Sequence, residues 1–312
     1  MRFAFIIPGI MCVIAANAAD SLSGAIENVR AACGGISNEL GDMKTKAGIN
    51  TAVTGVGTVA GGVALGTGIA KSGVDAEIAD LESEIERLRA ANANTPVEQI
   101  TIADPVTFNR DLGNFVATYS AQLQKRESEL SELEQKSKTL GNWRTGMMAT
   151  STATNIAGAM VANTNKIRGD LKTTINECLA SVKTLSNVRM QARIEKSATD
   201  AELQRAERIV SACDAWSTVD IDVINRRASG AATSAGVGAG LGIAGTITSA
   251  SANSDATRGG DDTREKKLNT AANVLAGATT AASATATIFN ATQISAIKRA
   301  ATVADECEEA LR

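Results

Sequence analysis

Few residues of this 312-residue chain have the types and spacing that a catalytic site requires. The chain contains no histidine, so a serine or cysteine nucleophile would lack its commonest general base. The 34 acidic residues are scattered through the sequence, and no two of them stand out as an acid–base pair. We therefore expect no catalytic residue and no enzyme activity.

Two glycine motifs are superficially similar to nucleotide-binding loops. The sequence GLGIAG at 240–245 is a literal G-x-G-x-x-G, and Asp261 and Asp262 follow at about the expected distance. No β-branched strand precedes Gly240, however, and the chain shows no alternation of strands and helices. LGTGIAKS at 65–72 has leucine and alanine where a phosphate-binding loop needs glycine. We therefore expect no bound cofactor.

The cysteines are better candidates for chemistry. Four remain once Cys12 is assigned to a leader peptide, namely Cys33, Cys178, Cys213 and Cys307. An even number in an exported chain favours two disulfides, and buried free thiols are the alternative. The wide spacing and the missing histidine argue against zinc. Aspartates at 255, 261 and 262 lack the calcium-loop spacing and predict a polar turn, so no metal site is expected.

The amino terminus indicates export. Arg2, an apolar run over 3–13 and the small residues Ala16 and Ala18 follow the order of a cleavable signal peptide, which we assign to 1–18. The apolar run is too short for a mature transmembrane helix. We expect a periplasmic, cell-surface or secreted protein.

The elements that would position these residues are helical. Aromatic residues are only 3% of the chain, and both prolines of the mature chain, Pro96 and Pro105, lie in one short stretch. Apolar residues at spacings of three and four over 74–88 and 112–140 predict two coiled-coil helices, which the connection at 92–107 would fold into an antiparallel hairpin. The predicted seam comprises Val74, Ile78, Leu81, Ile85, Leu88, Tyr119, Leu123, Leu130 and Leu133.

Glycines four residues apart provide the second helical pattern. Such pairs lie on one helix face and let a neighbouring backbone approach closely. Each glycine costs about 1 kcal/mol relative to alanine in an exposed helix, so close packing or lipid must compensate. The predicted helix-packing positions are Gly57, Gly61, Gly62, Gly66, Gly236, Gly238, Gly240 and Gly242.

The order of these features suggests an internal duplication. Cysteine, glycine-rich stretch, charged insert, Ala/Thr-rich stretch and cysteine follow one another twice, which predicts repeat units at 19–195 and 196–312. The first unit carries the coiled-coil hairpin, 74–140, as its insert. Treating both units alike pairs Cys33 with Cys178 and Cys213 with Cys307.

Together these patterns predict an all-α protein of long antiparallel hairpins with a coiled coil and GxxxG-type packing. Interspersed charges with a net of −3 leave no basic stripe, so nucleic acid is not expected as a partner. The segments at 145–165 and 269–293 are rich in Thr, Ser and Asn, which favours a water-soluble bundle over a membrane-inserted one. Two functions stay open: a non-enzymatic structural or interaction protein that engages protein partners or copies of itself, and a membrane-active protein with glycine-rich hairpins.

Overall fold

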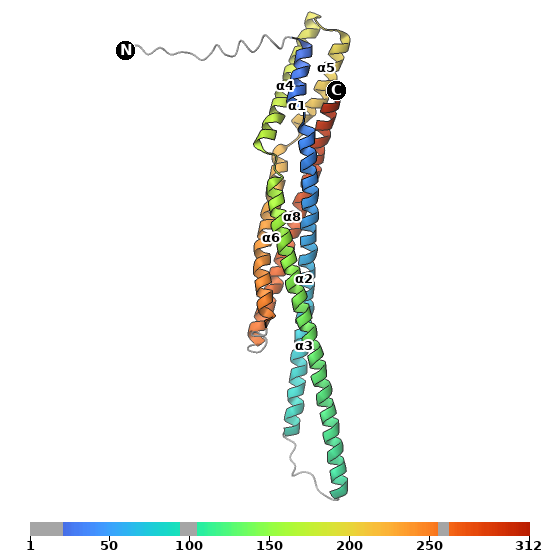
Figure 1. Ribbon diagram of the computed structural model, residues 1–312, viewed down its shortest axis with the longest axis vertical. Coiled ribbons are helices and arrows are strands. Elements are labelled where there is room, and N and C mark those ends of the chain that lie inside the picture. The colour runs from blue at the N-terminus through green and yellow to red at the C-terminus, as the bar shows by residue number, and fades with distance from the viewer. Residues whose placement is uncertain (1–20, 94–104, 255–261) are drawn as a thin grey trace, which may run out of the picture. The chain divides into compact units, whose positions relative to one another are not determined.

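The computed structural model describes residues 21–93, 105–254 and 262–312. Across these ranges every regular element is helical and no strand occurs, which confirms the all-α prediction (Figure 1). The predicted signal peptide and the acidic turn at 255–261 lie outside the described residues. The helices are α1 (Leu22–Cys33), α2 (Ile36–Ala93), α3 (Pro105–Thr164), α4 (Gly169–Glu195), α5 (Asp200–Asp214), the 3₁₀ helix η2 (Ala215–Thr218), α6 (Ile221–Ala252) and α8 (Asp262–Leu311).

The chain forms two compact units, each assembled from segments that are distant in sequence. Unit 1 consists of Met1–Thr54, Ala157–Ala235 and Thr285–Arg312, and unit 2 of Gly55–Ile156 and Gly236–Ala284. Helices α2, α3, α6 and α8 therefore contribute residues to both units. The predicted repeats are contiguous in sequence, so this spatial division does not test them, and the duplication stays a prediction.

Unit 1 has a large apolar core. Helices α1, α4 and α5 pack on one another (Figure 1). Trp216 of η2 is 2% exposed. Removing this many apolar side chains from water supplies the main favourable term in folding. Other fully buried members of the core include Ile36, Leu40, Ile175, Leu185, Ile209, Ile224 and Ile297.

Local signals in the sequence set the ends of the short helices in unit 1. Ser21 caps α1 by accepting a hydrogen bond from the Gly24 N–H at 3.0 Å. Gly35, with φ of 85°, provides the left-handed turn between α1 and α2. Thr199 and Glu202 form a capping box at α5, and the hydrogen bonds from the Thr199 N–H and hydroxyl lower the pKa of Glu202.

Unit 2 contains parts of the four long helices. Arg89 of α2 contacts Glu127 of α3 at 2.9 Å, and Glu84 contacts Arg126 at 3.0 Å. Nearer the start of the hairpin, Asp75 of α2 accepts a hydrogen bond from Ser137 of α3 at 2.6 Å. The α3 partner therefore moves from 127 to 137 as the α2 residue moves from 89 back to 75, so the two helices run antiparallel in the region predicted as a hairpin. The pKa of Arg126 is raised, first by its hydrogen bond to Glu129 and then by the charge of Glu84.

Candidate functional site: the polar interior of unit 2

The four cysteines form two disulfides in unit 1. Cys33 of α1 is bonded to Cys178 of α4, and Cys213 of α5 is bonded to Cys307 of α8. These are the pairs predicted from the sequence. They close separations of 145 and 94 residues, so each joins helices that are remote along the chain.

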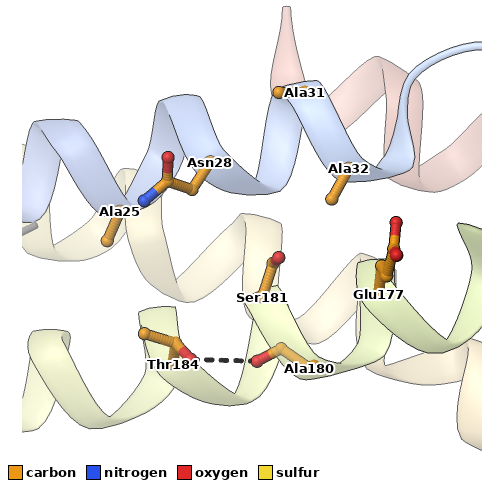
Figure 2. Close-up of a pocket in the computed structure, with 8 residues that line it drawn as sticks. All are labelled: Ala25, Asn28, Ala31, Ala32, Glu177, Ala180, Ser181 and Thr184. Carbon is orange, nitrogen blue, oxygen red and sulfur yellow. Dashed lines mark hydrogen bonds between the residues drawn. The ribbon is translucent and has the colours of Figure 1, made fainter. Parts of the chain in front are cut away.

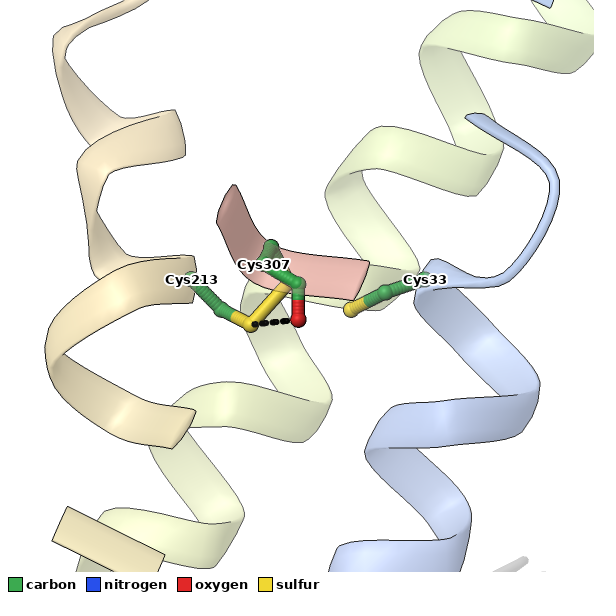
Figure 3. Close-up of side chains that lie close together, drawn as sticks. All are labelled: Cys33, Cys213 and Cys307. Carbon is green, nitrogen blue, oxygen red and sulfur yellow. Dashed lines mark hydrogen bonds between the residues drawn. A yellow bond between two sulfur atoms is a disulfide. The ribbon is translucent and has the colours of Figure 1, made fainter. Parts of the chain in front are cut away.

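The two disulfides lie next to each other in the core. The sulfur atoms of Cys33, Cys213 and Cys307 are all within 4.8 Å of one another (Figure 3). Metal ligation by cysteine requires thiolates. Because all three sulfurs are engaged in disulfides, this cluster is a structural crosslink and offers no thiolate to a metal.

A shallow groove runs between α1 and α4 on unit 1. It has a volume of about 510 Å³, and its lining residues are four alanines, Glu177 and the uncharged polar residues Asn28, Ser181 and Thr184 (Figure 2). Thr184 donates its hydroxyl hydrogen to the Ala180 carbonyl of its own helix at 3.0 Å. Glu177 is the one titratable group in the lining. The groove therefore presents no acid–base pair and no nucleophile with a base.

Half of the predicted helix-packing glycines face another helix. A Cβ at Gly57 would lie 2.6 Å from the hydroxyl oxygen of Thr154, and one at Gly61 would lie 2.6 Å from that of Thr280. At Gly238 and Gly242 the obstacles are Asn155, at 2.8 Å, and Thr152, at 2.3 Å. These separations are too short for a real Cβ, so a side chain at any of these four positions would require the facing side chain to move.

The other predicted glycines have an open environment. A Cβ at Gly62, Gly66, Gly236 or Gly240 would meet nothing within 4 Å. Each of the two glycine-rich helices therefore carries one set of glycines against a neighbour and a second set on its outer side.

The predicted seam residues lie in the hairpin part of unit 2. Val74, Leu81 and Ile85 are buried. The remaining seam residues are half-buried, namely Ile78, Leu88, Tyr119, Leu123, Leu130 and Leu133. Two helices alone can enclose only part of their side chains, so incomplete burial is what an isolated antiparallel pair produces.

Two cations are buried where the hairpin joins the four-helix part of unit 2. The Lys71 side chain is 0% exposed, and its Nζ contacts Asp75 Oδ2 at 2.6 Å and Glu265 Oε1 at 3.1 Å. Asp75 also accepts hydrogen bonds from Ser137 at 2.6 Å and Asn269 at 3.2 Å. The ammonium group of α2 is thereby linked to α3 and α8 through charged hydrogen bonds.

Arg144 of α3 is the second buried cation. Its Nε donates to Ser249 Oγ of α6 at 2.8 Å, and its Nη2 donates to Asn269 Oδ1 of α8 at 2.8 Å. A longer bond from Nη1 reaches Asn273 Oδ1 at 3.3 Å. Burial lowers the pKa of the Arg144 guanidinium, and the nearby carboxylates of Asp75 and Glu265 oppose that shift. One arginine therefore ties α3 to α6 and α8.

Polar side chains continue along the interior of unit 2. Ser151 donates to the Gly57 carbonyl at 2.8 Å, and Asn155 Nδ2 donates to Ser283 Oγ at 2.8 Å. Ser151, Asn155 and Ser283 are 0% exposed, and Gly57 is also buried. Interhelical hydrogen bonds, rather than large apolar side chains, therefore connect α2 with α3 and α3 with α8.

Unit 1 shows the same pattern where α2, α8 and the end of α3 meet. Asn50 Nδ2 donates to Asn290 Oδ1 at 2.9 Å, and Gln293 Nε2 donates to the Asn165 carbonyl at 2.9 Å. Each of these four residues is at most 1% exposed. The interior formed by α2, α3 and α8 is thus polar in unit 1 as well.

The outer surface of unit 2 has the opposite character. Val59 and Ile69 of α2 are 68% and 61% exposed, Ile247 of α6 is 63% exposed and Val274 of α8 is 66% exposed. Val56, Val63, Trp143, Ile156, Val237 and Ile243 are also exposed. The four helices therefore turn aliphatic side chains outward and serine, threonine and asparagine inward.

Threonines on the outer surface satisfy their own hydroxyl groups. Thr67, Thr150 and Thr248 each donate to the carbonyl four residues earlier, at 2.9, 3.0 and 2.8 Å. A hydroxyl bonded in this way does not require water as an acceptor. The outer surface is accordingly less polar than its threonine content indicates.

The apolar interior of unit 2 is small beside that of unit 1. Among the described residues its hydrophobic cluster comprises Ala64, Met148 and Ala276, with Leu65 and Met147 packed against it. A cluster of this size removes little apolar surface from water. This cluster of unit 2 therefore contains far fewer buried apolar side chains than the core of unit 1.

Sequence reasoning missed the charged network. Lys71 and Arg144 were visible only as charges beside long uncharged stretches, and their partners Glu265 and Ser249 are more than 100 residues away. A lone cation at the end of an uncharged helical segment is the one sequence signal that could have pointed to them.

Comparison of the chain with protein-family models, with curated proteins and with solved structures gives no match, so function rests on the geometry alone.

Proposed function

We propose that the chain is an exported, non-enzymatic structural protein whose small-residue helices lie in a lipid bilayer and whose coiled-coil hairpin engages protein partners. The two disulfides fit an oxidising, exported location. The observation that carries the proposal is the inverted distribution of side chains in unit 2, with polar groups inside and aliphatic groups outside.

This distribution is favourable in lipid and unfavourable in water. In a bilayer, helices associate through small residues and interhelical hydrogen bonds, because lipid tails provide no hydrophobic drive between them. Ionisable residues in such proteins face the bundle interior and pair with one another, as Lys71 does with Asp75 and Glu265. In water, the same surface would leave Val59, Ile69 and Val274 exposed without compensation.

The lengths of the uncharged segments support the proposal. Four stretches without Asp, Glu, Lys or Arg lie in α2, α3, α6 with the residues after it, and α8, at 47–70, 145–165, 228–254 and 268–297. We call these the uncharged segments. Each contains the roughly 20 residues that a helix needs to cross a hydrocarbon core. Glycines on the outer side, such as Gly62 and Gly66, cost less in lipid than in water because no solvent competes for their backbone groups.

Hydropathy by itself identifies one candidate span. Among the described residues, Leu22–Ala90 contains a window with a mean hydropathy of 1.4, of which 33% is buried. Segments 145–165 and 268–297 have lower hydropathy because of serine, threonine and asparagine. Many of those groups face inward, as Ser151, Asn155 and Ser283 do, so a window average understates how apolar the outer face is.

The hairpin is the part of unit 2 suited to protein contacts. Its helices carry exposed charges such as Arg89 and Glu127, and its seam is only half covered. Val116 is 54% exposed. A partner helix or a second copy of the hairpin could cover the remaining seam, as in larger coiled coils.

The two tryptophans allow a direct test. Trp143 lies on the outer surface of unit 2 and is 56% exposed, whereas Trp216 is buried in unit 1. We would mix the purified mature chain with phosphatidylcholine vesicles, follow Trp143 emission in a Trp216→Phe background and quench it with brominated acyl chains. Trp216 in a Trp143→Phe background is the matched control.

We expect the chain to float with the vesicles without detergent, Trp143 emission to shift to shorter wavelength and bromine to quench it. Trp216 emission should stay unchanged. If the protein remains in the aqueous fraction and Trp143 shows neither shift nor quenching, the bilayer role fails and the water-soluble bundle is the better interpretation.

A further inference from the structure

We propose that six basic residues on unit 1 bind the phosphate groups of anionic phospholipids, which rests on the proposed bilayer role. We call these six the basic belt. They are Lys46, Lys166, Arg168, Arg226, Lys298 and Arg299.

Residues of the basic belt adjoin the ends of the uncharged segments. Lys46 directly precedes 47–70, Lys166 directly follows 145–165 and Lys298 directly follows 268–297. Arg226 lies two positions before 228–254. All four segments therefore end, on the unit 1 side, within two residues of a belt cation.

Contacts within unit 1 place these ends in one layer. Asn50 joins Asn290 between α2 and α8, and Gln293 of α8 reaches the Asn165 carbonyl at the end of α3. Asn225 of α6 accepts from the Ile167 N–H at 2.7 Å. The basic residues stand within about two helical turns of these contacts, so α2, α6, α8 and the connection between α3 and α4 contribute cations at a similar level.

The belt is exposed and has a net positive charge. Lys166 is half-buried and the other five residues are exposed. In the segments 42–46, 166–172, 220–227 and 298–299, basic residues outnumber acidic ones nine to four, although the whole chain has a formal charge of −3. The acidic residues are Asp42, Asp170, Asp220 and Asp222.

Those carboxylates do not neutralise the belt firmly. Lys46 lies 3.8 Å from Asp42, and Arg226 lies 3.9 Å from Asp220. The Lys46 and Arg226 side chains are 52% and 74% exposed, and exposed pairs at such distances contribute little. The Lys46 amine and the Arg226 guanidinium can therefore turn to phosphate, and the Lys166 amine donates to the neutral amide oxygen of Asn163 at 3.0 Å.

The hairpin end of the uncharged segments differs. There Lys71 and Arg144 are buried and held by protein groups, so they are not available to a headgroup. Lysines exist at this end as well, at 136, 138 and 266, but they alternate with acidic residues such as Glu134 and Glu265. These three lysines provide a control set that matches the belt lysines in number and type.

The experiment compares two triple variants with the wild type. One is Lys46→Gln/Lys166→Gln/Lys298→Gln, and the control is Lys136→Gln/Lys138→Gln/Lys266→Gln. Flotation with phosphatidylcholine vesicles, and with vesicles containing 30% phosphatidylglycerol, measures partitioning at low and high salt. Circular dichroism and Trp216 emission show whether each variant is folded.

We expect phosphatidylglycerol to strengthen partitioning of the wild type and the control variant at least tenfold at low salt, and the belt variant to lose most of that gain. High salt should remove the gain from all three proteins. An equal phosphatidylglycerol effect in the belt and control variants, or none in the wild type, would overturn the belt.

Different results would contradict the proposed basic belt and the proposed bilayer role. Quenching of Trp143 that is equal in both vesicle types retains the bilayer role and rejects the belt. Binding to phosphatidylglycerol vesicles that depends on the belt lysines, without quenching of Trp143, retains the belt and rejects insertion.

Discussion

At the scale of single residues, Lys71 has the most demanding environment in unit 2. Its ammonium group has no access to solvent and depends on two carboxylates that are 28% and 21% exposed. Removing the cation leaves both carboxylates near each other with Arg144 as the neighbouring cation, and breaking a buried pair in this way is costly. Lys71 therefore holds α2 to α8 only as long as the whole set of partners is present.

We predict that Lys71→Met lowers the free energy of unfolding by about 3 kcal/mol, the lower end for a broken buried pair, because its partners are partly exposed. The matched control is Lys46→Met, whose 3.8 Å pair with Asp42 is exposed and whose loss should change stability by less than about 0.5 kcal/mol. Denaturant unfolding in detergent micelles measures both. Similar values for the two variants would show that the network around Lys71 contributes no more than a surface pair.

At the scale of helices, neighbouring glycines on α2 have opposite environments. A side chain at Gly61 would meet Thr280 of α8, with 2.6 Å to its hydroxyl oxygen and 3.3 Å to its Cα. At Gly62 it would enter open space. Consecutive residues on a helix point about 100° apart, so one of two overlapping GxxxG pairs can face a neighbour while the other does not.

This contrast gives a paired prediction for the helix–helix contact. Gly61→Leu should push α2 and α8 apart and lower the free energy of unfolding by about 1 to 3 kcal/mol. Gly62→Leu should leave it unchanged or raise it by up to about 1 kcal/mol, because leucine favours helix over glycine. Thermal melts of both variants in the same micelles measure the difference. Equal melting temperatures would mean that α2 does not depend on close contact at Gly61.

The helices illustrate what sequence can predict for this protein. Regular spacing of Val74, Leu81 and Ile85 was enough to predict the antiparallel hairpin, and the order of the cysteines was enough to predict both disulfides. Both conclusions use local periodicity or sequence order. Local periodicity and the order of residues along the chain therefore predict the hairpin and the two disulfides.

The candidate site depended on information that the sequence does not show. Overlapping pairs of glycines do not indicate which face meets a neighbour, and the hydrogen bonds of Arg144 join residues 105 to 129 positions apart. Hydropathy averaged along the chain mixes inward polar groups with outward aliphatic ones. Only the three-dimensional arrangement separates Ser151 and Asn155, which are buried, from Val59 and Val274, which are exposed.

At the scale of the whole molecule, the two units have different sources of stability. Unit 1 combines a large apolar core with two disulfides, and both features stabilise a fold in water. Unit 2 combines close glycine contacts and buried hydrogen bonds with an aliphatic exterior, and these features favour helix association in lipid. Each unit contains one tryptophan, so the two can be followed separately.

We predict that Cys33→Ser/Cys178→Ser lowers the thermal transition reported by Trp216 in a Trp143→Phe background. The chain-entropy model gives a loss of about 4 to 5 kcal/mol for a crosslink over this many residues, and measured losses are often smaller. The same substitutions in a Trp216→Phe background should change the Trp143 transition much less, because unit 2 contains neither cysteine. Fluorescence-detected melts of the four proteins provide the measurement.

We predict that lipid, unlike the disulfide, affects the Trp143 transition more than the Trp216 transition. Moving the wild-type chain from detergent-free buffer into phosphatidylcholine vesicles should raise the transition reported by Trp143, since lipid then covers the exposed aliphatic side chains, and should leave that of Trp216 nearly unchanged. If both tryptophans instead report one coincident transition that moves equally with the disulfide and with lipid, the units unfold together. The stability of unit 2 would then depend on the disulfide core rather than on the bilayer.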